Sequence, residues 1–193
     1  GAMDEPSLRL ANMLVRNNPG DACLEMTLVG PELEALSNTQ IAITGADITP
    51  KINGQGMQMW QTTSVKEGDV ISFEKRRSGC RAYLSVKGGI NVPSVLGSRS
   101  TYVRGTLGGI HGRQLKTEDI IEGFHSFKTS DFKLYVPQHL IPTFTNEAHV
   151  EVVQGPQTEY FTKSGVETFL SNPYTVTTEA DRMGYRLEGP TIE

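Results

Sequence analysis

The chain has 193 residues, of which 37% are hydrophobic, so it is long enough to bury one sizeable core. Its formal charge of -4 and its interleaved acidic and basic residues offer no basic stripe, which argues against a nucleic-acid partner. No apolar run approaches the roughly 20 residues that a membrane span needs, and the first residues do not resemble a signal peptide. We therefore expect a cytoplasmic protein with no membrane partner.

The first element is predicted to be an amphipathic helix. Asp4 can accept hydrogen bonds from the free amides of a first turn, and Pro6 is tolerated there. Residues 17–20, Asn-Asn-Pro-Gly, end the apolar periodicity formed by Leu8, Ala11, Leu14 and Val15. Asn12 shares this apolar face, so its amide is expected to turn inward and bind the backbone of the following loop.

Short β-type runs separated by turn residues follow the helix. They are residues 23–29, 39–44, 69–73, 81–86, 133–136 and 148–153. Their close spacing predicts a mainly β fold, an antiparallel barrel or sandwich, rather than a parallel sheet with crossover helices. A second helix is predicted over residues 162–170, ended by Ser171-Asn172-Pro173.

Glycine and proline are concentrated in residues 88–112, with apolar residues interspersed among them. This pattern predicts a long structured loop rather than a linker, and such loops often carry function. Hydrogen-bonding groups are dense in it, because the hydroxyls of Ser98, Ser100 and Thr101 flank the guanidinium of Arg99. They are suited to a carboxylate, a phosphate or a bicarbonate-like group. The alternative is a capped turn, which serine and threonine also favour.

The run of residues 81–86 alternates polar and apolar side chains. Arg81, Tyr83 and Ser85 are expected on one face of a strand, with the apolar side chains packed in a core on the other. For Arg81 the sequence leaves open a salt bridge or anion binding. Glu25, in an apolar run, is expected to meet an arginine; the alternative is a general base of raised pKa.

Several chemistries lack their motifs. The four histidines have no metal-ligand spacing, so no metal is expected. Neither a Walker loop nor a Gly-x-Ser-x-Gly elbow occurs, so any ATP should be bound by another subunit. Cys23 and Cys80 are predicted to be buried thiols.

One stretch of sequence is echoed within the chain. Residues 24–34, LEMTLVGPELE, resemble residues 185–193, YRLEGPTIE, since both run from a β-type segment into Gly-Pro. Coincidence would explain the echo, because Gly-Pro after a strand is ordinary turn chemistry. Otherwise the chain holds one full repeat and the opening of a second.

Together these motifs resemble the KipA-like family, which includes the C subunit of bacterial 5-oxoprolinase and the carboxyltransferase domains of allophanate hydrolase subunit two and urea carboxylase. The resemblance covers the whole chain. It rests on GAMDxxSLRLAN at 1–12, LEMTLVGP at 24–31, RAYLSVKGGI at 81–90, LGSRSTY at 96–102, GRQLK at 112–116, GPQTEYF at 155–161 and DRMGYRLEGP at 181–190.

The resemblance implies a cyclophilin-like β-barrel with two related halves. Residues 1–145 would form the first half, with an upstream segment missing, and residues 146–193 the beginning of a truncated second half. The unfinished second half predicts oligomerisation, as a homo-oligomer, or domain exchange, because an exposed strand edge must be covered by a complementary fragment, a partner or a dimer contact.

The family also implies an activity. The C subunit works with the A subunit, which uses ATP, together with a KipI-like B subunit, to convert 5-oxoproline to glutamate. One alternative is a regulator that binds and antagonises an inhibitor of a histidine kinase. Another is a carboxyltransferase domain of a urea or allophanate pathway. No cofactor is expected on this chain, ATP is used by a partner subunit, and biotin enters only under the carboxyltransferase alternative.

Both enzyme activities need donors for an anion that forms on a carbonyl or ureido oxygen. Arg99, Ser98 and Arg81 are predicted to supply them as the catalytic groups. Substrate-binding residues are predicted at Ser100, Thr101, Tyr83, Asn12, Glu25, Asp4 and Arg182, of which Asp4, Asn12, Glu25 and Arg182 match positions of the family motifs.

Overall fold

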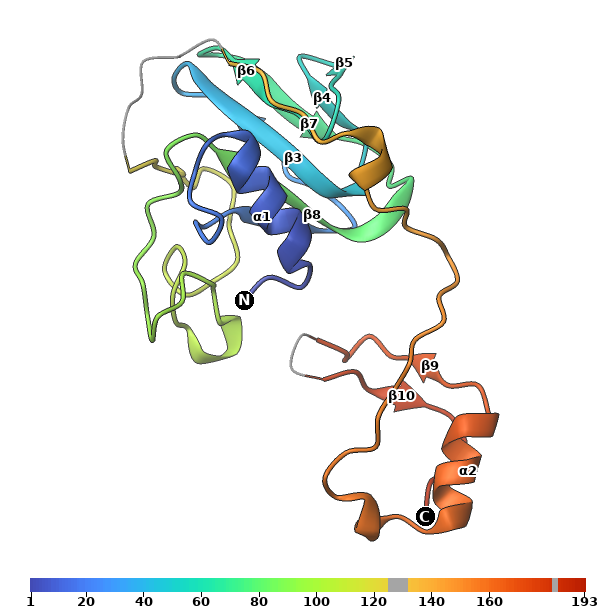
Figure 1. Ribbon diagram of the computed structural model, residues 1–193. Helices are drawn as coiled ribbons and strands as arrows, with labels where there is room; N and C mark the ends of the chain where they lie inside the picture. Colours follow the sequence, from blue (N-terminus) through green and yellow to red (C-terminus); the bar gives the residue numbers. More distant parts are fainter. Residues whose placement is uncertain (125–131, 182–183) are drawn as a thin grey trace. The chain divides into compact units, whose positions relative to one another are not determined.

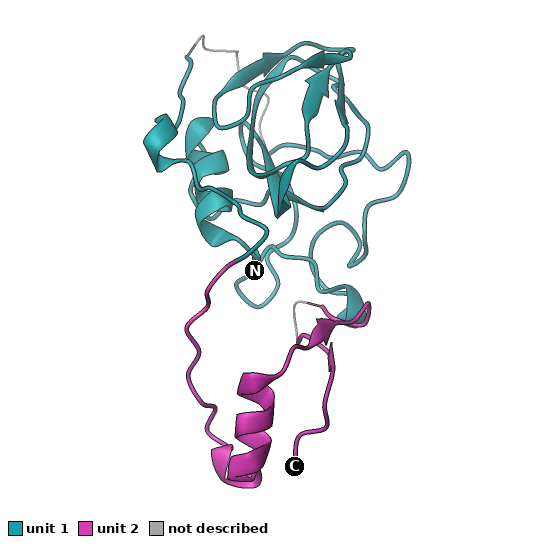
Figure 2. Ribbon diagram, turned by 90° about the vertical axis from the view of Figure 1, so that its right-hand side faces the viewer, with its two compact units in different colours: residues 1–147 teal, residues 148–193 magenta. Residues whose placement is uncertain are grey.

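The computed structural model describes residues 1–124, 132–181 and 184–193 (Figure 1). These residues divide into two compact units, Gly1–Glu147 and Ala148–Glu193, which Figure 2 shows in different colours. Within the described chain, neither α-helix has the length and apolar character of a membrane span.

The first unit holds two antiparallel four-stranded sheets, so the predicted mainly β fold is confirmed. One sheet has the order β1-β8-β3-β6, formed by Leu24–Thr27, Ser78–Val86, Thr39–Asp47 and Thr63–Val65. The other has the order β2-β7-β4-β5, formed by Leu33–Glu34, Val70–Phe73, Pro50–Ile52 and Gln55–Gly56. In Figure 2 these strands curve around a common interior.

The main core draws apolar side chains from both sheets. Its buried members are Met26, Ala35, Ile41, Ile43, Ala46, Ile48, Val65, Ile71, Ala82 and Leu84. The longest pairing joins β3 and β8, and its register shifts between Gly45 and Asp47. Gly45 has a φ of +81, and a Cβ there would lie 2.4 Å from the Arg81 carbonyl oxygen. Only glycine fits this bulge without strain, and the bulge lets β3 bend.

Helix α1, Glu5–Leu14, packs on the outer face of β3 and β8, as Figure 1 shows. Asp4 caps it as predicted, because its carboxylate accepts the Ser7 N–H at 3.1 Å and the Ser7 hydroxyl at 2.5 Å. A second apolar cluster lies under the helix and includes Leu14, Val15, Ala42, Trp60 and Val136. The helix therefore covers a sheet face that would otherwise expose apolar side chains.

Helix α2, Lys163–Ser171, belongs to the second unit and confirms the predicted second helix. Thr162 caps it by accepting the Gly165 N–H at 3.0 Å. The same unit contains a short pair of strands, β9 at Thr175–Val176 and β10 at Leu187–Glu188. Three 3₁₀-helices complete the described chain, at Val103–Gly105, Gln138–Leu140 and Thr158–Tyr160.

Two predicted strands were wrong. Residues 133–136 form only an isolated bridge, from Tyr135 to Gln61, and residues 148–153 are exposed and form no strand. Their apolar composition suits a strand, but pairing also requires a neighbouring backbone, which composition does not reveal. The sequence also missed β2, β4, β5, β6 and β9, because runs of two or three residues are too short for an alternating pattern.

The packing of α1 generates a stability prediction. Leu14→Ala should lower the free energy of unfolding by about 2–5 kcal/mol, because it leaves a cavity between α1 and β3. Trp60 is the only tryptophan and lies in the same cluster, so its fluorescence during urea unfolding reports on this unit. Met13→Ala is the control, since Met13 is 53% exposed on the same helix. Equal unfolding midpoints for both variants would contradict the assigned packing.

Candidate functional site

The polar face of β8 lies beneath α1. Tyr83 and Ser85 are fully buried there, while Ala82 and Leu84 point into the main core, so the predicted alternation is confirmed. Burial on the polar face is possible because the hydrogen-bonding groups are paired. Thr44 of β3 contributes to the same face by donating its hydroxyl to the Ser7 carbonyl of α1 at 2.7 Å.

Tyr83 joins two other predicted site residues, Glu25 and Asp4. Its hydroxyl donates to Glu25 Oε2 at 2.8 Å and accepts the Asp4 N–H at 2.8 Å. Glu25 Oε2 also accepts the Met3 N–H at 3.0 Å. Burial raises the pKa of Tyr83 well above its ordinary value, and the Glu25 carboxylate raises it further. The tyrosine therefore stays protonated and holds the residues before α1 against β1 and β8.

Asn12 lies at the centre of a second buried group. Its side chain is 0% exposed, and its amide donates to the Asp21 carbonyl at 2.8 Å. Its oxygen accepts the Ser85 hydroxyl at 2.6 Å and the Asn17 amide at 3.3 Å. The prediction that Asn12 turns inward to bind the following loop is thus confirmed. Contact between Asn12 and a substrate stays a prediction.

Arg99 contacts two groups that the sequence did not single out. Its Nη1 lies 3.7 Å from Asp21 Oδ1, and its guanidinium carbon lies 4.7 Å from the centre of the Phe124 ring. Ser98, the preceding residue in the loop, accepts the Ser100 N–H on its hydroxyl at 3.1 Å. Ser100 and Thr101 are both half-buried. The loop thus brings one guanidinium and three hydroxyl-bearing residues into one short segment.

Arg81 lies elsewhere. It pairs in register with Thr27, at the far end of β1, and its guanidinium donates to the Thr27 hydroxyl. Asp21, the partner of Arg99, precedes the other end of β1. Arg81 and Arg99 thus pair with residues near opposite ends of β1, and no contact joins them among the residues that the structure describes. Arg182 lies outside the described residues.

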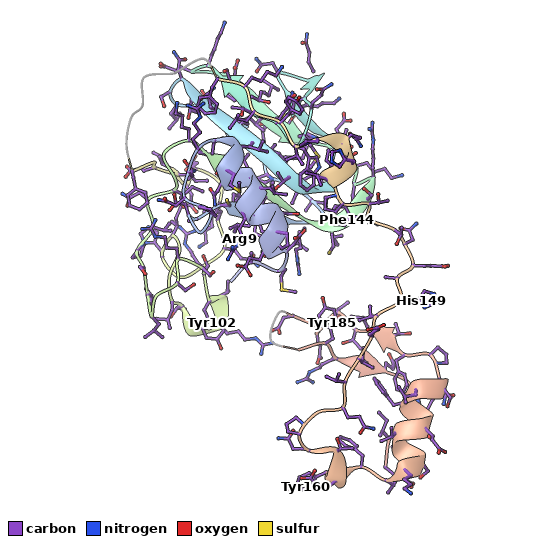
Figure 3. The ribbon with its side chains drawn as sticks, in the orientation of Figure 1. Arg9, Tyr102, Phe144, His149, Tyr160 and Tyr185 are labelled. Atoms are coloured by element: carbon purple, nitrogen blue, oxygen red, sulfur yellow. The ribbon has the colours of Figure 1, made fainter. Side chains whose placement is uncertain are left out.

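Arg113 and Asp119 form a bidentate ion pair in the chain that follows this loop. Arg113 Nη1 and Nη2 donate to the two oxygens of Asp119 at 2.6 and 2.8 Å. These bonds hold the pKa of Asp119 well below its usual range. Tyr102, labelled in Figure 3, marks the part of the loop distant from the sheets. No group of three metal-ligating side chains gathers among the residues that the structure describes.

Asp21, Phe124 and Asn17 are the residues that sequence reasoning missed. Asn17 donates to the Val86 carbonyl at 2.8 Å and accepts the Gly88 N–H at 2.8 Å. The sequence placed Asn17 only in a helix-stopping turn and gave Asp21 and Phe124 no role. A polar residue directly after a helix stop and before a strand was the available signal for Asp21.

The family model described as carboxyltransferase domain, subdomain A and B, matches residues 1–193, so the chain belongs to this family. It is 38% identical over 197 residues to urea amidolyase of Saccharomyces cerevisiae, covering 98% of this chain and 11% of that protein. It is 32% identical over 193 residues to the C subunit of 5-oxoprolinase from Escherichia coli, covering 100% of this chain and 61% of that protein.

A solved structure agrees with these relatives. The crystal structure of Kluyveromyces lactis urea carboxylase matches with a TM-score of 0.86 and 36% identity, covering 100% of this chain and 18% of that one. The chain spans less than two thirds of the length of each of these relatives. The resemblance inferred from the sequence motifs is confirmed at the level of the family.

The two cysteines differ, which corrects one expectation. Cys80, near the start of β8, is exposed, whereas Cys23 is half-buried. Burial raises the pKa of Cys23 to about 12, partly opposed by hydrogen bonds with Ser85 and Asn12.

We expect an alkylating reagent at about pH 8 to modify Cys80 rapidly and to spare Cys23, because only a thiolate reacts and the Cys23 thiol stays protonated. Mass spectrometry of the digested protein measures both rates. Denaturant should equalise them, which serves as the control. Equal rates in the native protein would contradict the raised pKa of the half-buried Cys23.

Proposed function

We propose that this chain belongs to a 5-oxoprolinase component of the C-subunit type, which works with the A and B subunits to convert 5-oxoproline to glutamate. Support comes from the Escherichia coli protein of that description, which matches along the entire chain. The sequence has no nucleotide-binding loop, so ATP is used by a partner subunit. Dependence on ATP makes the cytoplasm the expected location.

The observation that carries the proposal is the state of Arg99. Its guanidinium forms an ion pair with Asp21, yet among residues 1–124, 132–181 and 184–193 it makes no hydrogen bond. Opening of the cyclic amide of 5-oxoproline places negative charge on the carbonyl oxygen. A guanidinium with unused N–H groups can bind that oxygen, and the hydroxyls of Ser98, Ser100 and Thr101 lie in the same loop.

A second candidate is a carboxyltransferase domain that acts on urea. The 38% identity with yeast urea amidolyase favours it. Carboxybiotin would then be a substrate delivered by another domain, and the charge would develop on a ureido oxygen. Arg99 has the same role in both reactions, because both demand donors for an oxygen anion.

The two reactions are separated by assays of the full-length protein. Combined with the A and B subunits, it should release glutamate from 5-oxoproline only when ATP is present. If it instead consumes carboxybiotin in the presence of urea, the second candidate replaces the first. If neither reaction occurs with all components soluble, both enzyme proposals fail and binding of a regulatory protein is favoured.

Arg99→Ala should reduce turnover of the assembled enzyme by about 10²–10³-fold, the usual effect of removing one oxyanion donor. Arg9→Ala is the matched control. Arg9 lies on the exposed side of α1, as Figure 3 shows, where it pairs only with Glu5 among the described residues. Circular dichroism should show that both variants are folded. Wild-type turnover of folded Arg99→Ala would refute the role of Arg99.

A further inference from the structure

Two supports limit the orientation of the Arg99 guanidinium. The Asp21 carboxylate lies 3.7 Å from Nη1, and the Phe124 ring lies 4.7 Å from the guanidinium carbon. The side chains of Arg99 and Asp21 are 35% and 20% exposed, so the pair is shielded but still reachable from solvent. A planar cation held by a carboxylate and an aromatic ring has few orientations left.

Asp21 is itself fixed in place. Its carbonyl accepts the amide of the fully buried Asn12 at 2.8 Å, and its N–H donates to the Asn18 carbonyl at 3.0 Å. Its Oδ2 accepts the Asn18 N–H at 3.0 Å. Oδ1 is the oxygen that faces Arg99. The position of this oxygen therefore depends on the buried contacts beneath α1.

Phe124 is fixed from the other side. Ile90 and Gly123 form a bridge, and the Asn91 N–H donates to the Glu122 carbonyl at 2.8 Å. Gly89 has a φ of +75, and a Cβ there would lie 3.5 Å from Phe124 and 3.6 Å from Asp21. The backbone after β8 thus runs beside both supports of Arg99.

The separation of 3.7 Å between Arg99 and Asp21 exceeds that of a hydrogen bond, so Asp21 attracts Arg99 without consuming its donors. The Arg113–Asp119 pair shows the contrast, because its two bonds of 2.6 and 2.8 Å occupy one side of the guanidinium. From this geometry we propose that Asp21 is a positioning residue, which aims the N–H groups of Arg99, none of them hydrogen-bonded among the described residues, at the anionic oxygen of the substrate. This inference rests on the proposed function of Arg99.

The first test compares Asp21→Asn, Asp21→Glu and Glu74→Gln in the assembled enzyme. Asparagine keeps an oxygen for the Asn18 N–H but loses the charge that orients Arg99. We expect kcat to fall about 10- to 100-fold with KM little changed, since misorientation weakens an interaction made in the transition state. Asp21→Glu should recover part of kcat. Glu74→Gln removes a carboxylate from the exposed Lys51 pair and should leave turnover unchanged. Wild-type kcat in Asp21→Asn would overturn the proposal.

A double-mutant cycle separates positioning from a general structural effect. In an Arg99→Ala background, Asp21→Asn should cause no further loss, because Asp21 acts through Arg99. A full additional loss in that background would overturn the positioning role. If Arg99→Ala alone leaves turnover intact, the proposed function of Arg99 fails instead, and the orientation of its side chain is then decided by spectroscopy.

The spectroscopic test needs no activity. In an NMR spectrum, the Arg99 Nε–Hε signal can be assigned by its loss in Arg99→Lys. Its chemical shift in the wild-type chain should be displaced by the Phe124 ring. Asp21→Asn should return this signal toward the position of an unrestrained arginine, and Phe124→Leu should remove the ring-induced shift. An Arg99 signal that is unaffected by Asp21→Asn would refute the proposal. If Asp21→Asn fails to fold, as judged by thermal melting, the Asp21→Glu spectrum is used instead. A shifted Arg99 signal in Asp21→Glu would support the proposal, and an unchanged signal would refute it.

Discussion

The buried amide of Asn12 is the contact on which the site depends. It is fully buried, and its polar atoms contact Ser85 on β8, Asn17 after the helix and the Asp21 carbonyl. A buried polar group that loses its partner costs about 1–3 kcal/mol, so these contacts are strongly favoured together. They join α1, β8 and the turn before β1. They therefore fix the backbone at Asp21, whose carboxylate faces Arg99.

Glycine conformation links this buried group to the loop. Gly88 donates its N–H to Asn17 at 2.8 Å, and Gly89 follows with a φ of +75. A residue with a side chain would be strained at this φ, whereas glycine is not. The backbone at position 89 can therefore pass close to Asp21 and Phe124. The end of β8 and the orientation of Arg99 are thus parts of one packed arrangement, although a long segment separates them from α1 in the sequence.

Local patterns predicted the elements whose causes are local. The Asp4 cap, both α-helices and the two faces of β8 were predicted from neighbouring residues, and the structure confirms them. Residues 133–136 and 148–153 have strand composition, but their pairing depends on distant backbone. Asp21 was missed for the same reason, since its partner Arg99 is distant in sequence and the meeting depends on the fold. The exposed Cys80 shows that residue type alone does not determine burial.

The contacts of the arginines indicate which part of the site can bind a ligand. Arg113 is committed to Asp119 through two short bonds, and Arg81 donates to Thr27 at the far end of β1. Arg99 is held by charge and by an aromatic ring, interactions that orient a guanidinium while leaving its N–H groups available. Such a group suits an oxygen whose charge grows during reaction, because the donors are in place before the charge appears. The two proposed reactions act on different compounds, a lactam and a ureido substrate. Both reactions nevertheless require that a negative charge on a substrate oxygen be stabilised.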